Sequence, residues 1–279
     1  MKPLKFPNAA ALLALATKGG CAPLSLLPAK NITPAVDDLP ATFTHQSLAA
    51  VLETYVERGR VDYAALQDNC QQLYRFNASL AQVKPEAYAQ WSEAKRVAFW
   101  IDAYNALTLQ VILAHYPTRS ILVVPGAWTR FNFDIAGQEL TLNAIEHEIL
   151  RQQFNEPRIH MALVCASHGC PPLRSEPYSG DRLNAQLDDN TQMFLRDPAN
   201  FAIDREKNTV TLSAIFKWFG QDFVATYGDE VAYAGYSPAQ GATLNFISRF
   251  LNPADREFLA SGSYRVTYAR YDWSLNSQS

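Results

Sequence analysis

The 279-residue sequence lacks the features that would mark it as a nucleic-acid-binding, nucleotide-binding or repeat protein. Lysine and arginine number 24 against 27 aspartates and glutamates, so the net charge of -3 supplies no basic field for a phosphate backbone. The chain has no internal repeat, no low-complexity tract, no glycine-rich phosphate loop and no paired Cys-x-x-Cys site. We therefore expect no nucleic-acid partner and no bound cofactor, and look for chemistry in individual side chains.

The amino terminus looks like a targeting segment. Lys2 and Lys5 precede a short apolar run at residues 9–16, far below the about 18 apolar residues that a membrane span needs. Small residues precede Cys21, as in the cleavage box of bacterial lipoproteins, although Lys18 stands where such boxes carry an aliphatic residue. We expect an exported protein, periplasmic or envelope-associated, which attaches to the membrane if Cys21 is lipidated.

The sequence divides into a targeting segment at residues 1–21, a proline-rich linker at 22–42 and a single domain at 43–279. Apolar residues recur at helical spacing in the first half of the domain, and one helix, expected from Pro85 to Tyr116, is apolar on most faces from Val97 onward. Residues 120–124 are expected to form a strand, followed by hairpins at about residues 131–142 and 201–212, further helices, and a last strand at 264–268. The pattern predicts an α+β fold, with a helical amino-terminal half around a buried central helix and short antiparallel strands after it.

The stretch at residues 158–174 carries the densest chemistry. It begins as an apolar run of the length expected for a buried strand and then breaks at Gly169 and Pro171. A buried strand that ends in a forced turn leaves side chains at the rim of the fold. The thiols of Cys165 and Cys170 lie in this break, and we take them as the centre of the site.

A second candidate element precedes this stretch. Asn143 and Glu146 have the spacing of a helix cap, with a carboxylate three residues after the capping side chain. His147 then falls in the first turn of the helix, where the positive end of the helix dipole disfavours protonation of an imidazole. A neutral imidazole is the form that a general base requires.

Four ordered stretches resemble the successive signature blocks of the family known as domain of unknown function 547. They lie at residues 99–107, 145–151, 162–174 and 271–276. The resemblance covers the chain from about Phe43 to its end, and it departs from the family pattern at Asp102 and Ala103. It implies an exported bacterial protein and a fold like that of cysteine peptidases or transglutaminases, and it supplies no established activity.

The leading functional hypothesis is a thiol-dependent hydrolase or acyl transferase that acts on a peptide, an amide or another small molecule. In this hypothesis Cys165 is the nucleophile and His147 is the base that converts it to a thiolate. Glu146 or Asn105 orients the imidazole. The hypothesis requires that the thiol and the imidazole meet in one cleft, which sequence spacing alone does not establish.

The segment after Cys165 supplies the predicted substrate contacts. Arg174 is placed to bind a substrate carboxylate in a bidentate fork. The backbone amides of residues 166–169 are expected to hold an oxyanion, with Ser167 and His168 at the rim. Cys170 directly precedes a proline, so it is an alternative nucleophile at a helix start. A disulfide between the two thiols is the structural alternative.

Two other functions remain open from the sequence. Cys165, His168 and Cys170, together with His147 or His160, are ligand types that zinc accepts, although their spacing is not that of a common zinc motif. The domain is alternatively a non-catalytic, envelope-associated module that binds a peptide or glycan on aromatic side chains. The aromatic residues for such a surface are Trp128, Trp218, Phe219 and Trp273.

Overall fold

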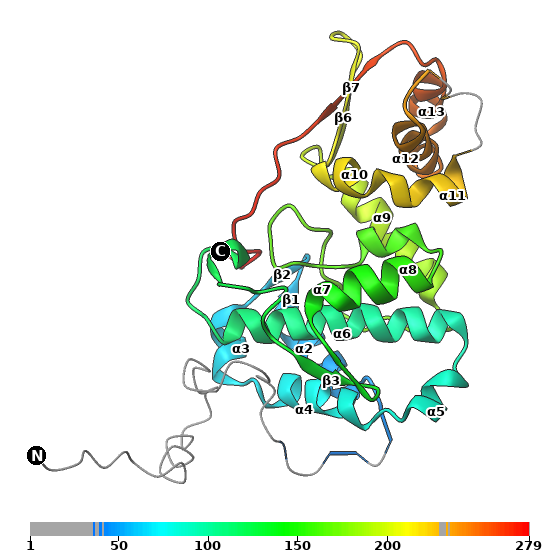
Figure 1. The fold of residues 1–279 in the computed structure, drawn as a ribbon. Coiled ribbons are helices and arrows are strands. Elements are labelled where there is room, and N and C mark those ends of the chain that lie inside the picture. The colour runs from blue at the N-terminus through cyan, green and yellow to red at the C-terminus, as the bar shows by residue number, and fades with distance from the viewer. Residues whose placement is uncertain (1–35, 37–38, 41, 229–232, 234, 279) are drawn as a thin grey trace, which may run out of the picture.

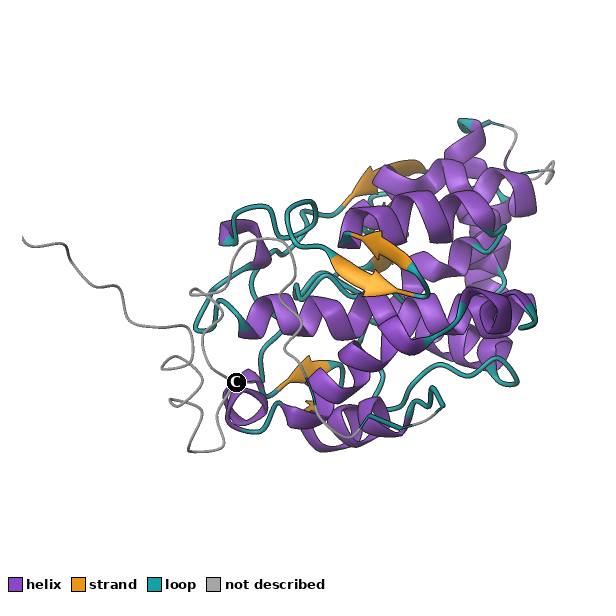
Figure 2. Cartoon of the chain, turned by 60° about the horizontal axis from the view of Figure 1, so that its bottom comes forward, coloured by secondary structure: helices purple, strands orange, loops and turns teal. Residues whose placement is uncertain are grey.

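The computed structural model describes residues 36, 39–40, 42–228, 233 and 235–278. The predicted targeting segment, Cys21 and most of the predicted linker lie outside these residues. Within the described part of the chain, no helix is both long enough and apolar enough to cross a membrane. Two parts of the chain are stacked one above the other, and helices predominate in both (Figures 1 and 2).

The first part, which ends where helix α9 (Leu183–Arg196) begins, is a set of helices around one long helix, α6 (Figure 1). Its helices are α2 (Gln46–Tyr55), α3 (Tyr63–Asp68), α4 (Gln71–Ser79), α5 (Pro85–Ala89), α6 (Glu93–Leu113), α7 (Leu142–Ala144) and α8 (Arg151–Gln153). Its 3-10 and π-helices are η3 (Leu80–Gln82), η4 (Ile121–Val123), η5 (Ile145–Leu150) and η6 (Pro157–Met161). Its strands form two antiparallel pairs, β1 (Val56–Glu57) with β2 (Arg60–Val61) and β3 (Phe133–Ile135) with β4 (Gln138–Leu140).

The predicted central helix is confirmed by the burial of α6. Every residue from Val97 to Leu113 is buried, and Trp100, with 0% exposure, is the largest of the fully buried side chains that the structure describes. Helices α3, α4, α7, α9 and η5 pack against it. The helix begins at residue 93 because the Ser92 side chain accepts a hydrogen bond from the Lys95 backbone N–H, which caps it. The single helix predicted from residue 85 is therefore divided into α5 and α6.

The second part of the fold follows α9 (Leu183–Arg196) and holds a three-stranded sheet with helices beside it. Its helices are α10 (Ala214–Phe219), η7 (Gly220–Phe223), α11 (Val224–Tyr227), α12 (Pro238–Ser248) and α13 (Pro253–Ala260). Strand β5 (Phe201–Asp204) pairs antiparallel with β6 (Thr209–Leu212), which pairs parallel with β7 (Arg265–Tyr268). Both predicted hairpins and the last predicted strand are present, so the α+β class is confirmed.

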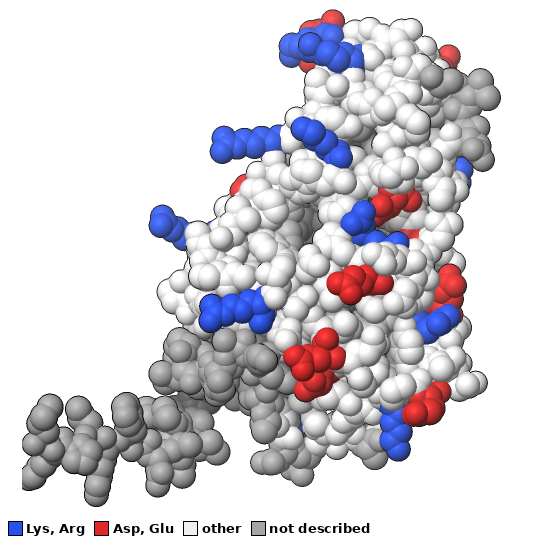
Figure 3. Space-filling model, viewed as in Figure 1, with Lys and Arg blue, Asp and Glu red and all other residues white. Residues whose placement is uncertain are grey.

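Two hydrophobic cores correspond to the two parts. One surrounds α6, and the other gathers side chains such as Phe216, Phe223 and Phe246. Tyr271 packs against both cores, so it lies at their boundary. On the face drawn in Figure 3, side chains of both charges are interspersed between wide uncharged areas.

Residues after β7 leave the second part and return to the first (Figure 1). Ser277 forms a bridge to Val61, and Leu275 forms one to Ser167. The Tyr63 hydroxyl donates a hydrogen bond to Asn276 Oδ1 at 2.7 Å. The returning segment thereby joins the end of the described chain to the loop that carries the two thiols.

Two predicted strands are wrong. Residues 120–124 contain the 3-10 helix η4, because the Ser120 side chain accepts the Leu122 backbone N–H and closes a turn. The apolar run after Arg158 begins as the 3-10 helix η6, with Pro157 in its first turn and Glu156 capping it. The rest of the run has no strand assignment: the Ala162 carbonyl and the Val164 N–H bond to the side chain of Asn105 on α6.

Candidate functional site

Two free thiols, those of Cys165 and Cys170, follow the apolar run at residues 158–164 and face each other. Cys165 Sγ lies 2.9 Å from Cys170 Sγ, and the Cys165 backbone N–H donates a hydrogen bond to Cys170 Sγ at 3.0 Å. The Tyr271 hydroxyl lies 3.3 Å from the first sulfur and 3.1 Å from the second. Cys165 is partly exposed, whereas Cys170 is 7% exposed. The two sulfurs and the phenol form a compact triangle, and Cys165 is the more exposed of the two cysteine residues.

The loop between the two cysteines is bent by an unusual backbone conformation. Ala166 has a φ of 58°, in the left-handed region that residues with a Cβ rarely adopt. The Cys170 N–H donates a hydrogen bond to the Ser167 carbonyl at 3.1 Å, which closes the turn. Ser167 is 1% exposed, and Cys165 Sγ donates to its Oγ at 3.6 Å. Strained conformations of this kind persist where surrounding contacts hold them, and they concentrate at functional sites.

The returning carboxy-terminal segment covers the outer side of this loop. The His168 N–H donates to the Ser274 carbonyl at 2.8 Å, and the Gly169 N–H donates to the Asp272 carbonyl at 2.9 Å. Two of the amides expected to form an oxyanion hole within residues 166–169 are therefore already bonded to backbone. These two N–H groups therefore do not form the oxyanion hole that was expected from the sequence.

Asn105 of α6 holds the chain that leads to the nucleophile candidate. Its Nδ2 donates to the Ala162 carbonyl at 3.0 Å, and the Val164 N–H donates to its Oδ1 at 2.9 Å. The side chain thus supplies both hydrogen bonds that a partner strand would otherwise make. These contacts position the backbone before Cys165, and neither involves an imidazole.

His147 does not lie at a helix start. The capping residue is Thr141, whose side chain accepts the Ala144 N–H, and not Asn143 as predicted. His147 lies in the π-helix η5, beyond the first turn. The influence of a helix dipole falls off within that turn, so the dipole effect expected from the sequence does not apply to His147. π-Helical turns often occur at functional sites, and η5 turns His147 and Glu146 toward the cleft described below.

A network of polar contacts determines which ring nitrogen of His147 accepts a hydrogen bond. Arg151 Nη1 lies 2.8 Å from His147 Nδ1, and because a guanidinium has only donors, Nδ1 must accept. A neutral ring then carries its proton on Nε2. Arg151 also donates two hydrogen bonds to Asp222, at 2.6 and 2.9 Å, and Asp222 lies 2.8 Å from His160 Nε2. In this tautomer His147 is a hydrogen-bond donor and not the predicted base.

A cleft of about 430 Å³ contains Cys165, Cys170, Glu146 and His147. Aromatic side chains dominate the rest of its wall: Tyr104, Trp128, Trp218, Phe219, Tyr271 and Trp273. The Tyr104 hydroxyl donates to Glu146 Oε2 at 3.1 Å, which fixes the carboxylate at the wall. The thiol and imidazole thus share one cleft, but no hydrogen bond between them is present among the described residues.

The surroundings shift the pKa values of the two thiols in opposite directions. A hydrogen bond from Cys170, with further bonds to Tyr271 and Ser167, lowers the pKa of Cys165 against the opposing effect of burial. Burial raises the pKa of Cys170 well above its ordinary value, and the neighbouring Cys165 adds to this rise. Cys165 is consequently the thiol that ionises first, and it is also the more accessible one.

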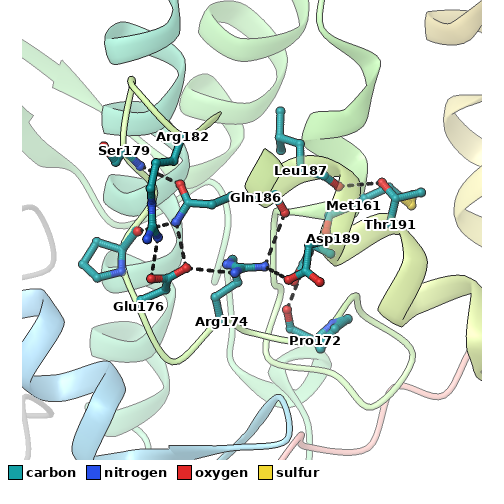
Figure 4. A network of polar contacts seen from close by, with 12 residues as sticks. Met161, Pro172, Arg174, Glu176, Ser179, Arg182, Gln186, Leu187, Asp189 and Thr191 are labelled. Carbon is teal, nitrogen blue, oxygen red and sulfur yellow. Dashed lines mark hydrogen bonds and ion pairs between the residues drawn. The ribbon is translucent and has the colours of Figure 1, made fainter. Parts of the chain in front are cut away.

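The remaining predicted substrate residues surround a different cavity, of about 550 Å³. Ser167, His168, Cys170 and Arg174 line it, so Cys170 belongs to the walls of both cavities. Arg174 is held in ion pairs with Glu176 at 2.9 Å and with a further carboxylate at 2.7 Å (Figure 4). Its guanidinium therefore bridges the loop to α9, and does not face the aromatic cleft.

The ion pairs of Glu176 lead to a prediction about the stability of the fold at low pH. Burial alone raises the pKa of Glu176, but bonds from Arg182, Arg174 and Gln186 outweigh it and lower the pKa from 4.5 to about 2. A depressed pKa contributes stability above pH 4.5 that is lost as the pH falls toward 2. Over this pH range we expect the free energy of unfolding to fall less in Glu176→Gln than in the parent protein. The difference should be under about 1 kcal/mol, because the carboxylate is largely solvated.

The measurement for Glu176 is denaturant unfolding between pH 2 and 5. The exposed Glu53 on α2 offers a matched control, and Glu53→Gln should leave the acid dependence of stability as in the parent protein. Equal pH dependence in the Glu176→Gln variant and the parent would contradict the prediction.

Several residues of the cleft were not singled out as functional from the sequence. Tyr271 and Tyr104 lie within the signature blocks, but no spacing rule indicated that their hydroxyls reach the thiols or Glu146. Arg151 and Asp222 are joined across 71 positions, which no local pattern reveals. The zinc alternative finds no support in the described residues, which hold no group of three or more His, Cys, Asp or Glu able to bind a metal ion.

The comparison with known families concerns the part of the chain that carries the site. Residues 88–195 match the model of the family described as Protein of unknown function, DUF547. The match supports the resemblance seen in the sequence, and it includes α6, the β3–β4 hairpin, η5 and the thiol loop. The DUF547 segment contains every predicted site residue, whereas Tyr271 lies outside it. No curated protein and no solved structure matches this chain.

Proposed function

We propose that the protein is a thiol-dependent enzyme that hydrolyses or transfers an acyl group of a peptide or amide, with Cys165 as nucleophile. The observation that carries this proposal is the position of the more acidic, more accessible thiol in an aromatic-lined cleft. Hydrogen bonds from Cys170 and Tyr271 stabilise the Cys165 thiolate, so no imidazole base is needed to form it. Because Nδ1 of His147 accepts from Arg151, its Nε2–H is left to donate a hydrogen bond to the substrate carbonyl.

Reaction with p-nitrophenyl acetate tests this proposal. The folded protein should release one equivalent of nitrophenolate rapidly, and mass spectrometry should locate the acetyl group on Cys165. Cys165→Ser should lose the burst, because a hydroxyl is not ionised at neutral pH. Acetylation of Cys170 in its place, or labelling only after unfolding, would contradict the assignment of the nucleophile.

A second candidate function is non-covalent binding of an apolar peptide or glycan in the same cleft. Trp273 stacks on Trp218 with 5.8 Å between ring centroids and packs edge-on to Trp128 at 6.3 Å. Trp218 is 46% exposed, an unusual value for so large an apolar side chain. Binding that survives in Cys165→Ser, without any acylation of the parent protein, would favour this function over catalysis.

A further inference from the structure

The two thiols form an asymmetric pair with a geometry suited to electron transfer. Their sulfurs are 2.9 Å apart, close to the about 2.05 Å of a covalent S–S bond. The loop already brings Cys165 and Cys170 together, because Ala166 takes its left-handed conformation and Tyr271 contacts both sulfurs. Oxidation to a disulfide would therefore shorten a contact that the two sulfurs already make.

We propose that Cys165 and Cys170 are a redox-active dithiol that reduces a disulfide bound in the aromatic cleft. This activity is separate from the proposed acyl transfer. Disulfide reduction needs both sulfurs, whereas formation of an acyl-enzyme needs only that of Cys165. The two thiols differ in exposure: both line the cleft, but Cys165 is partly exposed, whereas Cys170 is 7% exposed. The lowered pKa of Cys165 and the raised pKa of Cys170 agree with an attacking and a resolving thiol.

The reaction has two exchange steps. The Cys165 thiolate attacks one sulfur of the substrate disulfide, forms a mixed disulfide and releases the other sulfur as a thiolate, which takes a proton. Cys170 then loses its proton and attacks Cys165 Sγ, which forms the internal disulfide and expels the second substrate thiolate, which is also protonated. Two electrons pass from the dithiol to the substrate, which leaves as two thiols.

The cleft limits which disulfides can react. Its wall is rich in Trp and Tyr side chains, and its volume of about 430 Å³ accommodates a few side chains of a peptide. Aromatic faces bind extended apolar segments and polarisable sulfur well. The geometry therefore points to a disulfide carried on a peptide segment, with a small peptide disulfide as the simplest probe.

Reaction with oxidised glutathione tests the proposal. The full-length protein is reduced, freed of reductant and mixed with oxidised glutathione at neutral pH, and the products are mapped by mass spectrometry. The parent protein should gain a Cys165–Cys170 disulfide and release two molecules of reduced glutathione. Cys170→Ser should accumulate a glutathione adduct on Cys165, at a rate at least about tenfold above that on Cys170 in Cys165→Ser, because exchange follows thiolate fraction and access.

The double variant Cys165→Ser/Cys170→Ser measures the background from the other cysteines. Adduct formation at equal rates on the two thiols, or a stable adduct on Cys165 of the parent protein with no internal disulfide, would overturn the dithiol assignment. Acetylation of Cys165 without disulfide formation leaves the acyl-transfer proposal standing alone. Disulfide formation without acetylation leaves only the dithiol activity.

Discussion

Replacing Asn105 by alanine is expected to lower the free energy of unfolding by about 2–4 kcal/mol. The side chain is 5% exposed and makes two hydrogen bonds to the backbone before Cys165. Its loss leaves the Ala162 carbonyl and the Val164 N–H buried without these partners, and each unsatisfied group costs about 1–3 kcal/mol. Because these bonds also fix the start of the thiol loop, the rate of Cys165 alkylation should change as well. Chemical denaturation and iodoacetamide kinetics measure the two effects.

Asn77 of α4 provides a matched control for this variant. It is 2% exposed and bonds to the Ala106 carbonyl and to Gln110, on the side of α6 that faces α4. We expect Asn77→Ala to destabilise the fold similarly and to leave the alkylation rate of Cys165 in the folded protein unchanged. Equal alkylation kinetics in both variants would show that Asn105 stabilises the fold without positioning the thiol.

Gly169→Ala is expected to disturb the thiol pair from its outer side. A Cβ at this position would lie 2.9 Å from two ring carbons of Tyr271 and 3.1 Å from the Asp272 nitrogen. Overpacking of this kind costs about 1–3 kcal/mol, and it displaces the ring whose hydroxyl contacts both sulfurs. Since the Tyr271 bond helps to lower the pKa of Cys165, its displacement should raise that pKa. The pH dependence of alkylation should then move to higher pH.

Gly235→Ala is the corresponding control, because a Cβ there meets no atom of the described residues within 4 Å beyond its chain neighbours. This variant should keep both the stability and the alkylation profile of the parent protein. A Gly169→Ala protein with an unchanged alkylation profile would show that the Tyr271 hydroxyl does not influence the thiolate.

The elements that local pattern determines were predictable. The long run of apolar residues from Val97 predicts a buried helix, and the Ala136–Gly137 turn between alternating segments predicts a hairpin; both are present. The apolar run before Cys165 was misread as a strand because burial without alternation does not distinguish a strand from a short helix. What decides its conformation is Asn105, which lies 57 residues earlier than Ala162.

The site was predictable in its residue types but not in its contacts. Two thiols in a turn-forming stretch indicated chemistry near residues 165–170. Nothing in the sequence indicates that Ala166 adopts a positive φ, since alanine has no preference for it. Tyr271 reaches Cys170 across 101 positions, and such pairings depend on how the two cores pack. Arg151, which sets the tautomer of His147, was likewise beyond spacing arguments.

The returning segment that bonds His168 and Gly169 has a consequence for biosynthesis. Proteins are made from the amino terminus, so Cys165 leaves the ribosome about one hundred residues before Tyr271 and Asp272. Until then the nascent chain lacks the phenol that contacts both sulfurs and the carbonyls that close the loop. A translation product that stops before residue 271 would therefore carry the two thiols without the Tyr271 hydroxyl and these carbonyls. Full reactivity of the thiols requires a chain that has been synthesised past this point.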